Sequence, residues 1–143
     1  MKNLTKGAYK GIRQRNVNET VWNIYGYKFF KNEDCFKKLI SFAENDLSGL
    51  EFDYVIPIKP RNSGSDITYR LAVHIAGFLH CDMIDLLLYG NRSATKRDLK
   101  SYNILIVDDV MFTGKTAQKA FITIKNLKPK TISFYSLAKS DMK

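Results

Sequence analysis

Short apolar runs alternate along the chain with stretches in which apolar residues recur every three or four positions. Runs that favour buried strands cover residues 54–58, 83–89, 104–107 and 131–137. Between them, residues 67–78 and 117–127 carry apolar residues at helical spacing. Strands that alternate with helices predict an α/β fold, with a three-layer, mostly parallel sheet flanked by helices and joined by right-handed crossovers.

The first fifty residues have weaker patterns. Residues 1–20 are polar and basic, so we expect a basic N-terminal arm or cap, followed by a single domain over residues 21–143. Residues 21–30 are rich in aromatic side chains and contain Gly26, which favours a pair of strands joined by a turn. Asn32 precedes two acidic residues and an apolar stripe, so we expect it to cap a helix that ends at Ser48 and Gly49.

The composition limits the class of protein. A chain of 143 residues forms one domain around a single core. No apolar run approaches the roughly 20 residues needed to span a bilayer, and the N-terminus lacks an apolar signal core, so we expect a cytoplasmic protein without membrane association. Cys35 and Cys81 are isolated and lack metal-ligand spacing, so we expect two reduced thiols.

The formal net charge of +9 indicates that the protein binds a negatively charged partner or carries a basic surface. A basic excess of this size fits either nucleic acid or a polyanionic small molecule. Many of the lysines are scattered, which favours a solvated basic surface, and no nucleic-acid-binding motif is present. Nucleic acid therefore stays an open alternative, and charge alone does not decide it.

Candidate chemistry concentrates in residues 104–116, which read ILIVDDVMFTGKT. An apolar strand runs into the adjacent carboxylates of Asp108 and Asp109, and a short loop then leads into a helix. The carboxyl ends of parallel strands bind ligands in α/β folds, and the amino end of a helix attracts phosphate. The segment suits a ligand with a phosphate and either sugar hydroxyls or Mg²⁺. We expect Asp109 to lie in an exposed loop, and because the two acids repel each other, we expect a cation or sugar hydroxyls beside them.

Two known motifs can be compared with this segment. Its end, Gly114-Lys115-Thr116, resembles a Walker A loop, but that motif needs a glycine where this chain has Asp109. The whole run instead resembles the phosphoribosyl-pyrophosphate (PRPP) motif of type I phosphoribosyltransferases: an apolar strand, two acids, an apolar residue, a variable pair, then Thr-Gly-x-Thr. Residues 53–61, 70–76 and 136–139, with Gly64, further resemble the ComF-like members of this family. The zinc ribbon that such members often carry is missing here.

The resemblance implies a Mg²⁺-dependent transfer of a phosphoribosyl group from PRPP to an unknown base or amine, with release of pyrophosphate. Asp108 and Asp109 would hold the ribose hydroxyls directly or through Mg²⁺, and would favour the cationic transition state. The residues implied for the 5′-phosphate are Met111, Phe112, Thr113, Gly114, Lys115 and Thr116. Those implied for pyrophosphate are Lys59, Pro60 and Arg61, and those implied for a flexible closing loop are Arg92, Lys96 and Arg97. Homodimers are common in this family, so the resemblance makes a homodimer one possible state, but the sequence does not fix the oligomeric state.

Two departures from the family pattern leave three functions open. Residues 91–102 leave little room for the closing loop and the hood, which is the substrate-side structure of the family. Phe112 stands where a small or polar residue is common, and it cannot assist proton transfer. The chain is therefore read first as a transferase. The alternatives are a catalytically silent PRPP- or nucleotide-binding regulatory module, associated with nucleic acid in DNA uptake, stress or defence, and a glycohydrolase-like use of the site with water as acceptor.

Overall fold

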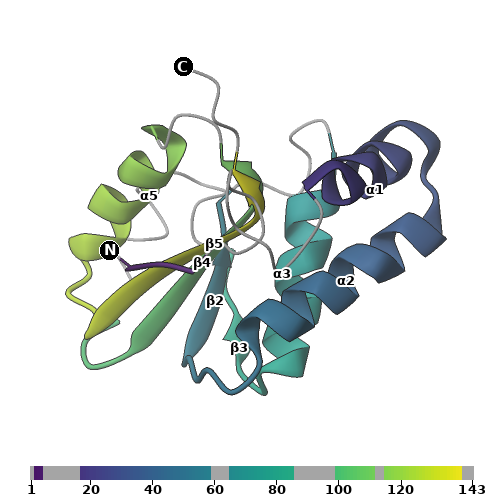
Figure 1. The fold of residues 1–143 in the computed structure, drawn as a ribbon. Coiled ribbons are helices and arrows are strands. Elements are labelled where there is room, and N and C mark those ends of the chain that lie inside the picture. Colours follow the sequence, from purple (N-terminus) through teal and green to yellow (C-terminus); the bar gives the residue numbers. More distant parts are fainter. Residues whose placement is uncertain (1, 5–16, 59–64, 86–98, 112–114, 140–143) are drawn as a thin grey trace.

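A five-stranded parallel sheet forms the centre of the computed structural model, which describes residues 2–4, 17–58, 65–85, 99–111 and 115–139 (Figure 1). Every pair of neighbouring strands is parallel, which confirms the predicted fold class. Across the sheet the strands lie in the order β1 (Lys2–Asn3), β5 (Thr131–Lys139), β4 (Asn103–Met111), β2 (Tyr54–Pro57) and β3 (Asp82–Met83).

Strand β4 is longer than its neighbour β2. The two strands pair from Tyr54 opposite Ile104 to Pro57 opposite Val107. On its other side β4 stays paired with β5 as far as Met111 opposite Lys139. The last four residues of β4, 108–111, therefore extend past the strand pairing with β2 while β5 still holds them.

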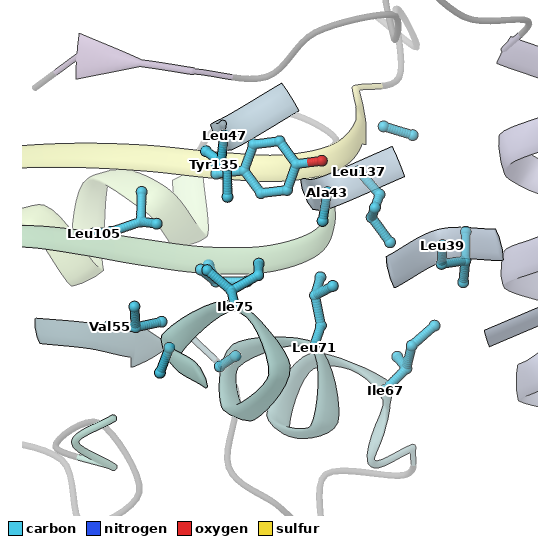
Figure 2. Packing of buried hydrophobic residues seen from close by; sticks show 14 of the residues in the cluster. Leu39, Ala43, Leu47, Val55, Ile67, Leu71, Ile75, Leu105, Tyr135 and Leu137 are labelled. Atoms are coloured by element: carbon cyan, nitrogen blue, oxygen red, sulfur yellow. The ribbon is translucent and has the colours of Figure 1, made fainter. Parts of the chain in front are cut away.

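Helices cover both faces of the sheet (Figure 1). Helices α1 (Val17–Phe30), α2 (Glu33–Leu47) and α3 (Ile67–Phe78) share one buried cluster with one face, and α5 (Lys115–Lys125) shares a second cluster with the other. Successive side chains of β4 alternate between them, since Leu105 packs in the first cluster and Ile104 in the second. Figure 2 shows the first cluster, where Leu71 and Ile75 of α3 lie against side chains of the sheet.

The N-terminal segment differs from its prediction. Residues 21–30 belong to helix α1 and do not form a pair of strands. Ile24 and Tyr27 are buried at helical spacing, whereas most of the aromatic residues that indicated strands stay on the outer surface of the helix. Gly26 makes no turn. It allows α2 to approach, because a Cβ atom at this position would lie 2.5 Å from the Sγ atom of Cys35.

The other predicted elements are present with shifted ends. Asn32 caps α2 as expected, and its side-chain oxygen accepts hydrogen bonds from the N–H groups of Asp34 and Cys35. Of the predicted arm, Lys2–Asn3 form β1 beside β5, and residues 5–16 lie outside the described residues. The strand predicted over residues 83–89 is described only as the short β3. No helix in the described ranges is long and apolar enough to cross a membrane.

Candidate functional site

The candidate site lies where the order of the strands reverses. From β2 the chain proceeds through β3 to one edge of the sheet, and from β4 it proceeds through β5 toward the other. In open parallel sheets, ligands bind outside the carboxyl ends of the strands at such a reversal. The extension of β4 past β2 carries Asp108 and Asp109 to this place.

Both acids are buried inside β4, with exposed fractions of 4% for Asp108 and 1% for Asp109. The expectation that Asp109 lies in an exposed loop is therefore wrong, because pairing with β5 continues the strand through Met111. One oxygen of Asp108 accepts hydrogen bonds from the N–H of Asp109 at 2.7 Å and from the hydroxyl of Thr68 at 3.3 Å. Oδ1 of Asp109 accepts from the N–H of Val110 at 2.8 Å. These contacts fix both carboxylates, as burial of charged groups requires.

Lys28 of α1 supplies a cation to Asp109. Its Nζ atom lies 2.5 Å from Oδ2 of Asp109, and 28% of its side chain is exposed. A neighbouring cation or sugar hydroxyl was expected from the repulsion of two adjacent carboxylates. The sequence did not identify Lys28 as this cation, because in the sequence it looks like the other scattered lysines. Once residues 17–30 are known to form a helix, Lys28 lies on the same helix face as the buried Ile24, one turn earlier.

Helix α1 is also bound to the amino end of α3, close to the acids. The Tyr27 hydroxyl donates to Oδ1 of Asp66 at 2.7 Å and accepts from Nη1 of Arg70 at 2.9 Å. Arg70 also pairs with Glu33 at 3.0 Å. Burial, followed by the hydrogen bond to Asp66, raises the pKa of the Tyr27 phenol, and the hydrogen bond to Glu33 raises the pKa of Arg70. Both groups keep their protons at neutral pH, so the network stays intact there.

The remaining predicted site residues are described only in part. Met111 is the last residue of β4, and Lys115 and Thr116 are exposed in the first turn of α5. The amino end of a helix thus follows the two acids closely along the chain, as a phosphate cradle requires. The predicted residues that lie outside the described ranges are Phe112, Thr113 and Gly114, then Lys59, Pro60 and Arg61, and finally Arg92, Lys96 and Arg97.

Asp108 and Asp109 are the residues that would supply the protein ligands of a magnesium ion. Among the described residues no group of three or more His, Cys, Asp or Glu side chains could hold a metal ion. Mg²⁺ needs fewer protein ligands, because it is commonly bound by one or two carboxylates while substrate phosphates and water complete its coordination. The carboxylate oxygens of Asp108 and Asp109 fit this requirement, although Lys28 contacts Oδ2 of Asp109.

Comparison with known proteins shows what this fold is similar to. No protein-family model and no curated protein sequence matches the chain. Adenine phosphoribosyltransferase from Saccharomyces cerevisiae, solved with an iminoaltritol bisphosphate and adenine, matches with a TM-score of 0.59 and 19% identity over 78% of this chain and 72% of that one. UMP synthase from Leishmania donovani matches with a TM-score of 0.59 and 17% identity over 79% of this chain, which spans only 24% of that protein.

Purine phosphoribosyltransferase from Pyrococcus horikoshii gives a TM-score of 0.52 and 17% identity over 78% of this chain and 87% of that one. Solved structures of three phosphoribosyltransferase-type proteins therefore share the fold of this chain. At these identities the similarity establishes the fold, and the reactions named belong to the other proteins.

Proposed function

We propose that the protein is a compact, ComF-like type I phosphoribosyltransferase that uses PRPP as donor and releases pyrophosphate. The observation that carries this proposal is the buried pair Asp108 and Asp109 at the reversal of strand order, with helix α5 beginning at Lys115, six residues after Asp109 in the sequence. The fold shared with phosphoribosyltransferases supports the same reading. The acceptor is a base or an amine.

The amino end of α5 would bind the 5′-phosphate of the donor. Lys115 and Thr116 lie exposed in its first turn, where N–H groups and the helix dipole favour a dianion. Phe112, Thr113 and Gly114 would complete this cradle. Lys59, Pro60 and Arg61 follow β2 in the sequence and would bind the pyrophosphate, and Arg92, Lys96 and Arg97 would close over it.

Asp108 and Asp109 would bind the ribose hydroxyls and favour the charge that develops on the ring. In the transfer, the bond from C1′ to a pyrophosphate oxygen breaks and its electron pair leaves with pyrophosphate. The acceptor nitrogen forms the new bond to C1′ and gives up its proton to water. Two carboxylates in a buried setting stabilise a cationic ring better than they would in water. Mg²⁺, held by these acids directly or through ribose or water, would supply positive charge to the leaving pyrophosphate.

One observation favours a second function, a PRPP- or nucleotide-binding module without transfer. Lys28 pairs with Asp109, whose side chain is only 1% exposed. An acid that is already neutralised and covered must exchange its partner before it can bind a sugar. A protein that binds PRPP slowly and releases it unchanged would fit this arrangement.

The proposal is tested by titration calorimetry of the purified protein with PRPP, with and without Mg²⁺, followed by pyrophosphate release with and without added bases or amines. We expect Mg²⁺-dependent binding that weakens at least about ten-fold, or about 1.4 kcal/mol, in Asp109→Asn. The matched control Asp34→Asn changes an exposed acid in α2 and should bind like the unchanged protein.

Each result of this experiment separates one function from the others. Pyrophosphate release that needs an added acceptor supports the transferase, and release without one indicates transfer to water. Binding without release under any acceptor supports the silent module. If the folded protein does not bind PRPP at all, the proposed function is wrong.

A further inference from the structure

Helix α1 places a lysine on an acid that the proposed function assigns to the ligand. We propose that Lys28 is an internal counter-ion that holds α1 against the site and must leave Asp109 before ribose hydroxyls, or a cation bound with them, can reach that carboxylate. The identity of the ligand rests on the proposed function, whereas the ion pair between Lys28 and Asp109 is a feature of the structure itself.

Both oxygens of Asp109 are engaged in the described structure. Oδ1 accepts the N–H of Val110 at 2.8 Å, and Oδ2 pairs with Lys28 at 2.5 Å. Oδ2 exposes less than 1 Å² to solvent. A hydroxyl group or a divalent cation therefore cannot approach Oδ2 while the Lys28 ammonium group stays in place.

Electrostatics require that the departure of Lys28 and the arrival of a ligand are coupled. Asp109 is only 1% exposed, so the departure of Lys28 on its own leaves a buried carboxylate without its counter-charge. Breaking a buried ion pair on one side alone is strongly unfavourable. A ligand that brings hydroxyl donors or a cation replaces the lost charge, so Lys28 leaves readily only when such a ligand binds.

The side chain of Lys28 can make this exchange because it touches a buried acid at one end and solvent along its stem. Its ammonium group reaches a buried acid, but 28% of the side chain is exposed, so the flexible stem has a path to solvent. Among the other residues of α1, Trp22 and Phe30 are 73% and 82% exposed, whereas Ile24 and Tyr27 are buried. Lys28 therefore reaches Asp109 from the border between the buried and the exposed surface of the helix.

The first test uses the ligand-free protein and compares Lys28→Met with Lys31→Met by amide hydrogen exchange. Lys31 is a suitable control because it directly follows the last residue of the same helix and pairs with Asp66 at 3.8 Å in an exposed setting, where an ion pair contributes little. We expect the amides of α1 to exchange about ten-fold faster in Lys28→Met and to be unchanged in Lys31→Met. Equal exchange in Lys28→Met and the unchanged protein overturns the proposal, whatever PRPP does.

A second variant keeps this test decisive if Lys28→Met does not fold. Asp109→Asn breaks the same ion pair from the other side, and the amides of α1 should again exchange about ten-fold faster. Protection that is unaffected in both variants would show that the pair does not hold the helix.

The second test measures PRPP binding in the presence of Mg²⁺, by calorimetry and by the fluorescence of Trp22. This residue is the single tryptophan of the chain and lies on α1, so its emission reports on that helix without a label. If Lys28 competes with the ligand, Lys28→Met should bind PRPP about ten-fold more tightly than the unchanged protein, because the cost of opening the pair is gone. Lys31→Met should bind like the unchanged protein.

The possible results have distinct meanings. Damage to the fold weakens binding, so tighter binding cannot come from lost structure. Weaker or unchanged binding in a folded Lys28→Met protein overturns the competition. If neither the unchanged protein nor the variants bind PRPP, the proposed function fails, while the exchange experiment still decides whether Lys28 holds α1.

Discussion

At Gly26, where α1 contacts α2, the Sγ atom of Cys35 decides whether an added methyl group raises or lowers the free energy of unfolding. A Cβ atom at position 26 would lie 2.5 Å from the Sγ atom of Cys35 and 3.4 Å from its Cβ atom. The first distance is a clash and the second is an ordinary contact. Gly26→Ala should therefore destabilise the protein by about 1–2 kcal/mol, since overpacking outweighs the roughly 1 kcal/mol by which alanine is favoured over glycine in a helix.

Removing the Sγ atom should reverse this effect. In a Cys35→Ala background the added methyl group at position 26 meets only the Cβ atom of residue 35. Gly26→Ala should then stabilise the protein by about 0.5–1 kcal/mol through helix propensity alone. The two substitutions should therefore couple by about 2 kcal/mol in a double-mutant cycle.

Urea unfolding of the four proteins, followed by the fluorescence of Trp22 and by circular dichroism, measures this coupling. The midpoint should fall in Gly26→Ala and rise when the same change is made in Cys35→Ala, with an unchanged slope. If Gly26→Ala is stabilising on its own, the thiol turns away without cost and the close approach of α1 and α2 does not depend on glycine.

Three further predictions concern groups outside this contact. Tyr135→Phe should lower the free energy of unfolding by about 1–3 kcal/mol in urea titrations, because the buried Tyr135 hydroxyl donates to the buried Asp46 carboxylate at 2.6 Å; an unchanged midpoint would show that Asp46 replaces this partner without cost. Tyr27→Phe removes the hydrogen bond to Asp66, so it should cost about 1 kcal/mol and speed amide exchange in α1, and unchanged exchange would contradict this role of the hydroxyl. Burial, followed by repulsion from neighbouring acids, raises the pKa of Cys81, so its alkylation should rise at a higher pH than that of an unfolded cysteine. The folded state holds this proton more tightly than the unfolded state does. The thiol therefore contributes fully to stability below its pKa in the unfolded chain, and this contribution is lost as the pH rises through its pKa in the folded protein. If Cys81 is alkylated with the pH profile of an unfolded cysteine, the raised pKa is refuted.

Strands and helices could be predicted where the local spacing of apolar residues fits only one type of secondary structure. The apolar runs of 54–58 and 104–107 predict strands, which the structure confirms as β2 and the first part of β4, and the apolar stripe of 67–78 predicts helix α3. The cap at Asn32 was also predictable, since a short polar side chain before two acids has few other uses. These patterns depend only on nearby residues, so they can be interpreted without knowing which elements pack beside them.

The end of β4 could not be predicted, because it depends on a distant partner. Two adjacent acids have low strand propensity, and their sequence indicates a loop. Pairing with β5 nevertheless extends the strand through Met111, and backbone N–H groups supply hydrogen bonds to both acids. The requirement for a nearby cation was visible in the sequence, whereas its source in α1 depended on how that helix packs.

Helix α1 was the hardest element to predict and is the one that bears most directly on function. Four of its five aromatic residues are exposed, whereas Tyr27 is buried and the next residue, Lys28, reaches Asp109. The transferase and the silent module need the same acids and the same phosphate cradle, so the sequence motif cannot separate them. If Lys28 competes with the ligand as proposed, they differ in whether it leaves Asp109 easily enough for turnover. A transferase must complete this exchange in every cycle, and a binding module can hold either state for long periods. The rate at which α1 opens, compared with the rate of pyrophosphate release, therefore distinguishes the two functions better than the motif does.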